Sequence, residues 1–210
     1  MNKSVKLTLT IVVVCLVSAL TLSYFYVSAK PRIERNKLDI ETKVKQEIIP
    51  EAEQFISVDG VSSFLSFEEA KDKKGDTIGF LIKNKTRGYG GDIVYLTGIT
   101  LDKEPRIINL KILEHKETPG LGAKVVEEKF LSQYVGKTVN EVILKKDSLE
   151  GKIEAISGAT ITSRALTNSI NQLLKKDIVK EIIEKRLIVS EDKKKEKKVS
   201  TKPMIKKETK

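Results

Sequence analysis

The first clear pattern in the chain is a long apolar run near its N-terminus. Leu7 to Ala29 contains no charged residue, and a helix of about 23 residues rises about 34 Å, which is enough to cross the apolar core of a membrane. Tyr24 and Tyr26 lie near one end of the run, where aromatic side chains meet the membrane surface. We therefore expect residues 1–30 to form a transmembrane anchor. A cleaved signal peptide is the alternative, because Val27-Ser28-Ala29 offers small residues at a plausible cleavage site.

Beyond the anchor, the spacing of apolar residues predicts helix first, then strands, then helix again. Apolar positions recur at helical spacing from Ile33 to Phe55, with Pro50 as an interruption. From Thr77 the period shortens to that of strands, and helical spacing returns at Lys124–Tyr134 and from Leu166 onwards. Strands followed by helices, without regular βαβ alternation, predict an α+β domain with an antiparallel sheet and flanking helices. The stronger strand candidates are TIGFLIKN, DIVYLTGITL and RIINLKILEH, and the weaker ones are VNEVILKK and GKIEAI.

The charged residues are unevenly distributed along the chain. The net charge of +10 comes from its two ends: residues 1–37 carry six basic side chains and one acidic one, and residues 190–210 carry nine lysines and four acids. Residues 38–189 are neutral overall, so the domain has no basic excess with which to bind nucleic acid. The C-terminal tail, residues 190–210, is too poor in apolar residues to fold alone, and we expect it to be disordered. It serves either for solubility or for contact with anionic lipid or an acidic partner.

Few residues are available for metal or nucleophilic chemistry. Cys15, the only cysteine, lies within the apolar run, and His115 is the only histidine. One cysteine excludes an intrachain disulfide and a cysteine metal site, and a single histidine argues against zinc. No G-x-S-x-G motif is present, which argues against a serine hydrolase. We therefore expect no metal site and no catalytic triad.

Two glycine-bearing segments are candidates for a binding site. Gly88–Asp92 lies between two predicted strands and contains three glycines, which is typical of a hairpin turn or of close backbone approach. His115–Gly122 follows a predicted strand, and its Pro-Gly pair favours a turn with positive φ at Gly120. The free backbone groups of such a loop could bind a flat polar heterocycle, although a plain connecting loop gives the same pattern.

A third candidate segment, Ser157–Ser163, is rich in hydroxyl groups and precedes a predicted helix. These hydroxyls, together with the free N–H groups and positive dipole end of the helix, would favour a bound phosphate. Gly158 would allow the backbone to approach such a ligand closely. No Gly-Lys-Ser/Thr follows at the required spacing, so the segment is not a Walker A loop. Ordinary helix capping by serine or threonine is the alternative.

Taken together, the three segments resemble those of a known family. EAISGATITS closely resembles the flavinylation motif of the FMN-binding domains in the Rnf and Na⁺-NQR respiratory complexes, and GYGGDI and HKETPGLGAK resemble two further blocks of that family in the same order. The chain length is closer to the G subunit of Rnf complexes than to the longer C subunit of Na⁺-NQR. The resemblance implies that Thr160 carries FMN through a phosphoester, donated from FAD by a separate flavin transferase. Glu154 stands where the family commonly has Asp, so the acid of the motif is one methylene longer here.

The resemblance also implies which other residues bind the cofactor. The loop from Glu117 to Gly122 would contact the isoalloxazine ring, and Leu121 would help to set its environment. The implied cofactor-binding residues are Ser157, Gly158, Ala159, Thr162 and Ser163 in the motif, and Glu117, Thr118, Gly120, Leu121 and Gly122 in the loop.

The function implied by the resemblance is that of a membrane-anchored electron carrier. Residues 31–189 would form an FMN-binding domain outside the cytoplasmic membrane, a side that the charge count alone does not decide. The chain would be one component of an ion-translocating Rnf-type oxidoreductase complex, with the other subunits, the transferase and membrane lipid as partners. It would not be self-sufficient, because it has neither a G-x-G-x-x-G fingerprint nor cysteines for an iron–sulfur cluster. The alternatives are a stand-alone anchored FMN-carrying reductase domain and a flavin-free anchored binding protein.

Overall fold

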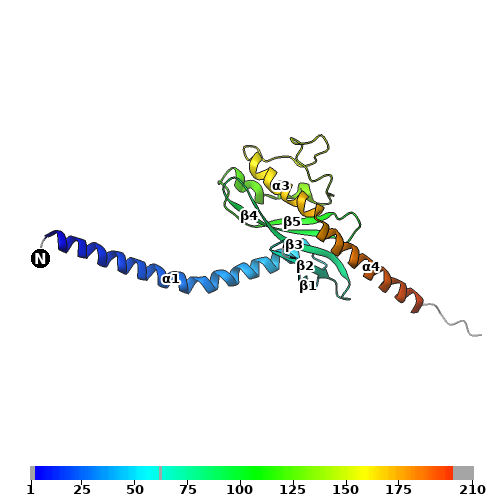
Figure 1. The fold of residues 1–210 in the computed structure, drawn as a ribbon, viewed down its shortest axis with the longest axis horizontal. Helices are drawn as coiled ribbons and strands as arrows, with labels where there is room; N and C mark the ends of the chain where they lie inside the picture. Colours follow the sequence, from blue (N-terminus) through cyan, green and yellow to red (C-terminus); the bar gives the residue numbers. More distant parts are fainter. Residues whose placement is uncertain (1–2, 62, 201–210) are drawn as a thin grey trace, which may run out of the picture. The chain divides into compact units, whose positions relative to one another are not determined.

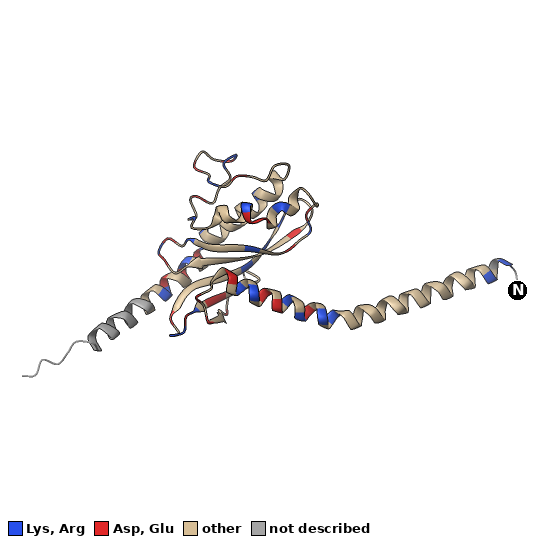
Figure 2. Ribbon diagram, turned by 180° about the vertical axis from the view of Figure 1, so that it is seen from behind, with Lys and Arg blue, Asp and Glu red and all other residues tan. Residues whose placement is uncertain are grey.

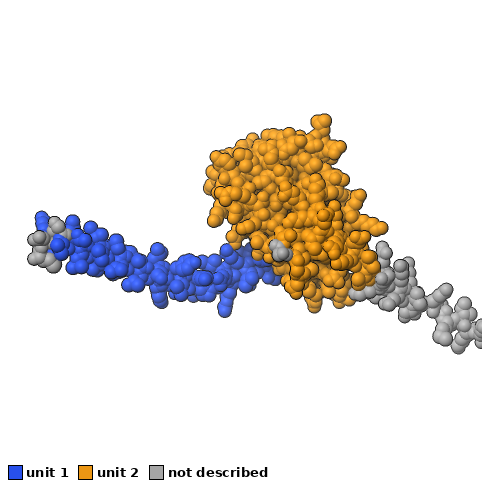
Figure 3. All heavy atoms as spheres, in the orientation of Figure 1, with its two compact units in different colours: residues 1–43 blue, residues 44–210 orange. Residues whose placement is uncertain are grey.

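The computed structural model describes residues 3–61 and 63–200. The chain divides into two compact units, residues 1–43 and residues 44–210 (Figure 3). The first unit is helical, and the second contains a five-stranded sheet with helices (Figure 1).

The apolar N-terminal run lies within α1 (Lys3–Ile48), one continuous helix. Within the described ranges it is the only helix that is long and apolar enough to cross a membrane, and none of its apolar window is buried inside the protein. Figure 2 shows this apolar stretch free of charged residues and the following turns densely charged. The helix predicted over Ile33–Phe55 is wrong at its end, because α1 stops before Pro50 and Gln54–Ser57 forms strand β1. A residue that precedes proline is disfavoured in helical conformation, which accounts for the stop.

The sheet is an antiparallel meander in the order β1-β2-β3-β4-β5, which confirms the predicted fold class. The three stronger strand predictions correspond to β3, β4 and β5, whereas the pattern did not predict β1 and β2. The sequence of β2, SFEEAK, carries two adjacent acids that hide the strand period. The strands after β1 are β2 (Ser66–Lys71), β3 (Thr77–Arg87), β4 (Asp92–Thr100) and β5 (Ile107–His115).

Both faces of the sheet are buried. In β3, Phe80 and Ile82 join the larger apolar cluster together with residues of α3 (Thr160–Lys175). Leu81, between them, joins a second cluster with Ile48 at the end of α1, because successive residues of a strand point to opposite faces. This two-sided burial explains why the strands read as nearly continuous apolar runs.

The two adjacent acids of β2 each pair with a cation on a different helix. Glu68 is 7% exposed, and both of its carboxylate oxygens lie 2.7 Å from Nζ of Lys45, in the last turn of α1. Glu69 is 2% exposed, and its Oε1 lies 2.5 Å from Nε of Arg186, a charge contact rather than a directed hydrogen bond. Arg186 belongs to α4 (Asp177–Ser200). The buried acids therefore attach two different helices to the sheet.

The region between the sheet and α3 departs most from the sequence-based expectation. The single helix predicted over Lys124–Tyr134 is three short turns: η1 (Gly122–Val126), α2 (Glu128–Leu131) and η2 (Ser132–Tyr134). The two weaker strand candidates contribute only one bridge between Leu144 and Ile153.

The C-terminal helix is longer than the sequence pattern indicated. The predicted disordered tail began at residue 190, but α4 continues as helix to Ser200. The remainder of the predicted tail lies outside the described residues.

Candidate cofactor-binding site

The three glycine-bearing segments meet at one buried carboxylate, that of Glu117, which is 6% exposed. The backbone N–H of Gly90, in the turn between β3 and β4, donates to Oε1 of Glu117 at 3.1 Å. The hydroxyl of Thr162, in the first turn of α3, donates to Oε2 at 2.8 Å. Glu117 itself lies in the loop after β5. A single side chain therefore connects segments that are far apart in the sequence.

Two further glycines are needed because the Glu117 carboxylate lies against their backbone. A Cβ atom at Gly88 would come within 2.1 Å of Oε1, and a Cβ atom at Gly122 would come within 2.3 Å of Oε2. Such distances are far below van der Waals contact, so any side chain at either position would displace the carboxylate. The segment Gly88–Asp92 is thus both the hairpin turn between β3 and β4 and a point of close backbone approach, and Gly122 serves close approach in the loop.

A cavity of about 430 Å³ opens beside this carboxylate. Its rim carries apolar surface that is left in contact with solvent, since Tyr89 is 73% exposed, Leu121 47% and Ile161 55%. Apolar walls with a few polar groups between them are typical of small-molecule and cofactor sites. The cavity is lined by Tyr89, Glu117, Thr118, Leu121, Gly122 and the run from Gly158 to Thr162.

The N-terminus of α3 forms one side of the cavity and has no side-chain cap in the described structure. Its N-cap position is Ala159, and Gly158, just before it, has a φ of 77°. The capping role considered for the hydroxyls is therefore not what this helix end shows. Uncapped N–H groups and the positive end of the helix dipole favour an anion at this point.

The four hydroxyls of the third segment occupy different environments. Thr162 is buried and bound to Glu117, and Ser163 is fully buried, donating to the carbonyl of Ala159 and accepting from the N–H of Ile156. Thr160 lines the cavity at the first position of α3. Ser157 is exposed and lines a different cavity.

Comparison with known proteins identifies the family. Residues 88–175, which run from the first glycine of the hairpin to the last residue of α3, match the family model of the FMN-binding domain. The chain is 32% identical over 184 residues to the G subunit of the Na⁺-translocating ferredoxin:NAD⁺ oxidoreductase complex of Acetobacterium woodii, covering 79% of this chain and 87% of the relative. The chain belongs to the G-subunit family of ion-translocating oxidoreductase complexes.

A further G subunit agrees with this membership, and one solved structure overlaps in part. The G subunit of the proton-translocating ferredoxin:NAD⁺ oxidoreductase complex of Clostridium ljungdahlii is 28% identical over 172 residues, covering 81% of this chain and 90% of the relative. The crystal structure of NqrC from Shewanella oneidensis overlaps with a TM-score of 0.43 at 19% identity, covering 59% of this chain and 65% of that chain. As a member of the G-subunit family, the chain is an electron-transfer flavoprotein component of an ion-translocating oxidoreductase complex, and the apolar part of α1 makes it a single-pass, membrane-anchored protein.

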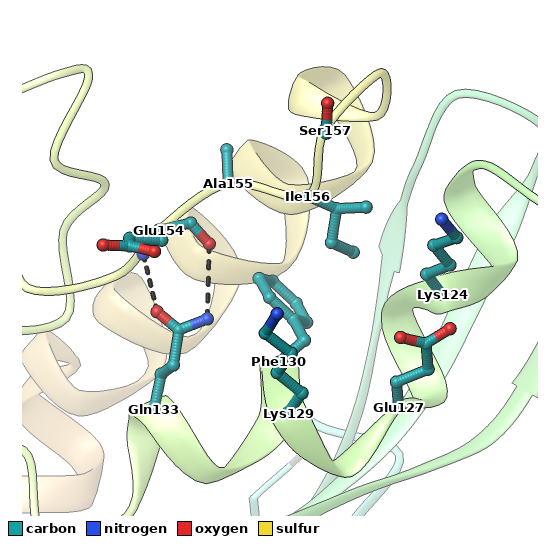
Figure 4. A pocket seen from close by; sticks show the side chains of 9 residues that line it. All are labelled: Lys124, Glu127, Lys129, Phe130, Gln133, Glu154, Ala155, Ile156 and Ser157. Atoms are coloured by element: carbon teal, nitrogen blue, oxygen red, sulfur yellow. Dashed lines mark hydrogen bonds between the residues drawn. The ribbon is translucent and has the colours of Figure 1, made fainter.

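The acid of the family motif, Glu154, lies outside the cofactor cavity. Its backbone is held by Gln133, which accepts from the Glu154 N–H at 2.7 Å and donates to its carbonyl at 3.4 Å. Glu154 lines the same neighbouring cavity as Ser157, and Figure 4 shows its carboxylate turned away from Ser157. The hydrogen bond from Lys145, at 2.6 Å, and its charge keep the pKa of Glu154 below its usual value. Glu154 therefore presents an ionised carboxylate to solvent.

The remaining predicted site residues are split between the cavity and its supports. Thr118, Leu121, Gly122, Gly158 and Ala159 line the cavity. Gly120 has a φ of 78°, which confirms the predicted turn, but does not line it. Ser163 and Ser157 are likewise not brought into this cavity.

Sequence reasoning missed three residues that the fold brings to the site. Tyr89 and Ile161 line the cavity, and Nζ of Lys146 lies 3.4 Å from Oγ1 of Thr160. Tyr89 could have been found, because an aromatic residue among three glycines in a turn has few packing partners. Lys146 carried no such signal, since its segment resembled a strand end.

A buried hydroxyl network fixes α3 behind the cavity. The hydroxyls of Tyr134 and Thr167 lie 2.7 Å apart, and Thr167 donates to the carbonyl of Ser163 at 2.8 Å. On β4, the hydroxyl of Tyr95 lies 2.7 Å from that of Ser169. Burial raises the pKa of Tyr95 to about 12 and that of Tyr134 further still, so both hydroxyls remain neutral. These hydrogen bonds therefore fix α3 against β4 and η2.

Among the side chains that the structure describes, no group of three His, Cys, Asp or Glu residues is placed to hold a metal ion.

Proposed function

We propose that this member of the G-subunit family carries FMN covalently, through a phosphoester to Oγ1 of Thr160. The observation that carries the proposal is the position of this hydroxyl. Of the hydroxyls in the motif, it alone both lines the cavity and leaves its side chain free of the buried network around Glu117 and Ser163. It also sits at the uncapped N-terminus of α3, where phosphate charge is stabilised.

Attachment would exchange the phosphoanhydride bond of FAD for a phosphoester bond to the threonine. Oγ1 of Thr160 forms a bond to the phosphorus of the FMN half of FAD, the pyrophosphate bond to the AMP half breaks, AMP leaves, and the hydroxyl loses its proton. No carboxylate or imidazole in the described part of the chain hydrogen-bonds Oγ1 of Thr160. A base must take that proton, so we assign it to the separate flavin transferase.

The cavity would then hold the isoalloxazine ring next to its attachment point. Its volume of about 430 Å³ falls in the range of small-molecule sites. Tyr89, Leu121 and Ile161 provide apolar surface for the faces of a ring, and the loop from Thr118 to Gly122 provides backbone donors and acceptors. Bound there, FMN accepts electrons and passes them on, and the covalent link prevents its loss to the surrounding fluid.

We further propose that residues 1–30 are the membrane anchor and that residues 31–189 work outside the cytoplasmic membrane. The other subunits of an Rnf-type complex would be electron-transfer partners, and basic residues near the membrane would contact lipid. Family membership supports these assignments, and protease digestion of intact spheroplasts tests the side. Cleavage of the domain only after the membrane is broken would contradict the outward orientation.

The attachment residue is tested by co-expressing the full chain with a flavin transferase and viewing the denatured band under ultraviolet light. The wild-type band should fluoresce as flavin, Thr160→Ala should lose the fluorescence, and Thr160→Ser should retain part of it. Ser157→Ala, which removes the other exposed hydroxyl of the motif, is the matched control and should stay fluorescent. Undiminished fluorescence in Thr160→Ala would contradict the assignment, and a wild-type band without flavin would favour the flavin-free binding protein.

A further inference from the structure

Three consecutive residues in the loop after Leu144 each point to a different partner. Lys145 pairs with Glu154 at 2.6 Å. Asp147 pairs with Arg164 through two hydrogen bonds of 2.8 and 2.6 Å. Lys146, between them, directs its Nζ to Oγ1 of Thr160 at 3.4 Å.

The loop is placed so that Lys146 reaches Thr160. Arg164 lies four residues after Thr160 in α3, so the two share one face of the helix, one turn apart. The two-pronged contact between Arg164 and Asp147 holds the loop against that face, because an arginine–carboxylate pair of this kind fixes direction as well as distance. The hydrogen bond from Arg164 keeps the pKa of Asp147 below its usual value, so the pair is ionised at neutral pH. At the base of the loop, buried Leu144 pairs with Ile153.

The charge of Lys146 is not used within the described structure. Lys145 and Arg164, its basic neighbours, each have a carboxylate partner, whereas no carboxylate lies within ion-pair distance of Lys146 among the described residues. An ammonium group that already contacts the acceptor oxygen is within reach of a phosphate formed on that oxygen. The chain thus carries an unpaired cation where attachment would create an anion.

We propose that Lys146 compensates the phosphate charge at Thr160, and that the Asp147–Arg164 pair positions it. Before attachment, the ammonium group attracts the anionic phosphate of the donor towards Oγ1. After attachment, it forms an ion pair with the phosphodiester. The proposal rests on the proposed attachment of FMN to Thr160 and adds a residue to it that lies outside the motif.

The test uses the full chain with purified flavin transferase and FAD, and compares Lys146→Ala with wild type. The initial rate of flavin incorporation should fall about fivefold at low salt, the factor that a surface ion pair of about 1 kcal/mol provides. The difference should shrink at high salt, because mobile ions screen exposed charges. Lys146→Arg should restore most of the rate, and Asp147→Asn should lower it less than Lys146→Ala does. Lys152→Ala is the matched control, since it removes an exposed lysine from the same loop.

A second readout does not depend on the rate. Flavin attachment should raise the unfolding temperature of the wild-type chain by more than that of Lys146→Ala, with a difference of about 2–4 °C. A purely structural role would shift the unmodified and modified forms of Lys146→Ala equally.

The outcomes separate this inference from the proposed function. If wild type is modified on Thr160 while Lys146→Ala matches it in rate, salt dependence and temperature shift, the role of Lys146 is wrong and the attachment site stands. A rate loss that salt does not reduce, or that Lys146→Arg does not restore, would equally overturn charge compensation. If wild type acquires no flavin on Thr160, both proposals fall.

Discussion

Buried carboxylates occur at two places among the described residues of the domain, and the two places differ in the partners of these carboxylates. On β2, Glu68 and Glu69 each face a cation from a helix, Lys45 and Arg186 respectively. Beside the cavity, Glu117 is equally buried but has no lysine or arginine within ion-pair distance in the described part of the chain. Its hydrogen-bond donors are neutral, a glycine N–H and a threonine hydroxyl.

The difference separates stability from function. A buried ion pair leaves little net charge, and removing one partner is costly because the other remains desolvated. A buried carboxyl group whose only partners are neutral donors instead fixes the position of the groups that donate to its two oxygens. We therefore assign the β2 acids to holding the helices on the sheet, and Glu117 to shaping the cavity.

The largest expected effect is a loss of stability when a buried carboxylate on β2 is removed. Glu68→Ala should lower the free energy of unfolding by about 3 kcal/mol, because the largely buried ammonium group of Lys45 would lose the carboxylate that holds it against β2. Flavin attachment in cells grown at low temperature should be unchanged, since this pair lies on the β2 strand and not in the cavity wall. Thermal unfolding by circular dichroism and band fluorescence measure the two effects. Loss of flavin without loss of stability would contradict the assignment of Glu68 to the stability of the fold.

The glycines around Glu117 should give the next largest effect. Gly122→Ala should cost about 2 kcal/mol, because its Cβ would lie 2.3 Å from Oε2 of Glu117 and 3.0 Å from the hydroxyl of Thr162. In the double variant with Glu117→Ala the shortest contact, that with Oε2, is removed and only the contacts of 3.0 Å remain, so the two effects should be clearly non-additive. Denaturant unfolding of the single and double variants measures this coupling. Simple additivity would show that the carboxylate does not occupy this position.

A smaller effect is expected at Gly120, where space is not limiting. A Cβ there would meet no atom within 4 Å, but the φ of 78° is unfavourable for other residues. Gly120→Ala should therefore cost about 1 kcal/mol through backbone strain alone. Gly120→Asn should cost less, because asparagine tolerates this conformation. Equal unfolding temperatures for both variants and wild type would contradict the turn geometry.

The smallest predicted effect concerns the reduction potential. Glu117→Gln keeps the size of the side chain but replaces the carboxyl group beside the cavity with an amide, which cannot carry a negative charge that opposes electron addition to a bound flavin. The midpoint potential should rise by about 20–30 mV for a two-electron couple, which corresponds to about 1 kcal/mol. Glu114→Gln, which removes an exposed charge nearby in the sequence, is the control and should change little. A fall in potential, or equal shifts in both variants, would contradict the role of Glu117.

The sequence predicted the parts of this arrangement that depend on local signals. Alternating and continuous apolar runs located β3, β4 and β5, and Pro-Gly located the turn at Gly120. Strand β2 was not predicted, because its two buried acids form ion pairs with Lys45 of α1 and Arg186 of α4. Both cations are distant in the sequence and come close to β2 only in the folded domain. An apolar pattern cannot reveal a strand whose buried positions are charged.

The candidate site shows the same limit. Its three segments were visible as glycine and hydroxyl clusters, but their common contact with the Glu117 carboxylate depends on tertiary structure. The distinction between Thr160, which is open to the cavity, and Ser163, which is buried, depends on how α3 packs. Helical periodicity alone could not place Lys146, because the loop that carries it is held by a contact with Arg164.

The central claim, that Thr160 carries FMN, is tested most directly by mapping the modification in the wild-type chain. Trypsin cleavage after Lys152 and Arg164 releases one peptide, Ile153–Arg164, that contains every hydroxyl of the motif. Tandem mass spectrometry with electron-transfer fragmentation, which preserves phosphoesters, locates the added mass. We predict the mass of one FMN less one water on Thr160 and on no other residue of the peptide. The same mass on Ser157, Thr162 or Ser163, or an unmodified peptide after co-expression with the transferase, would contradict the account.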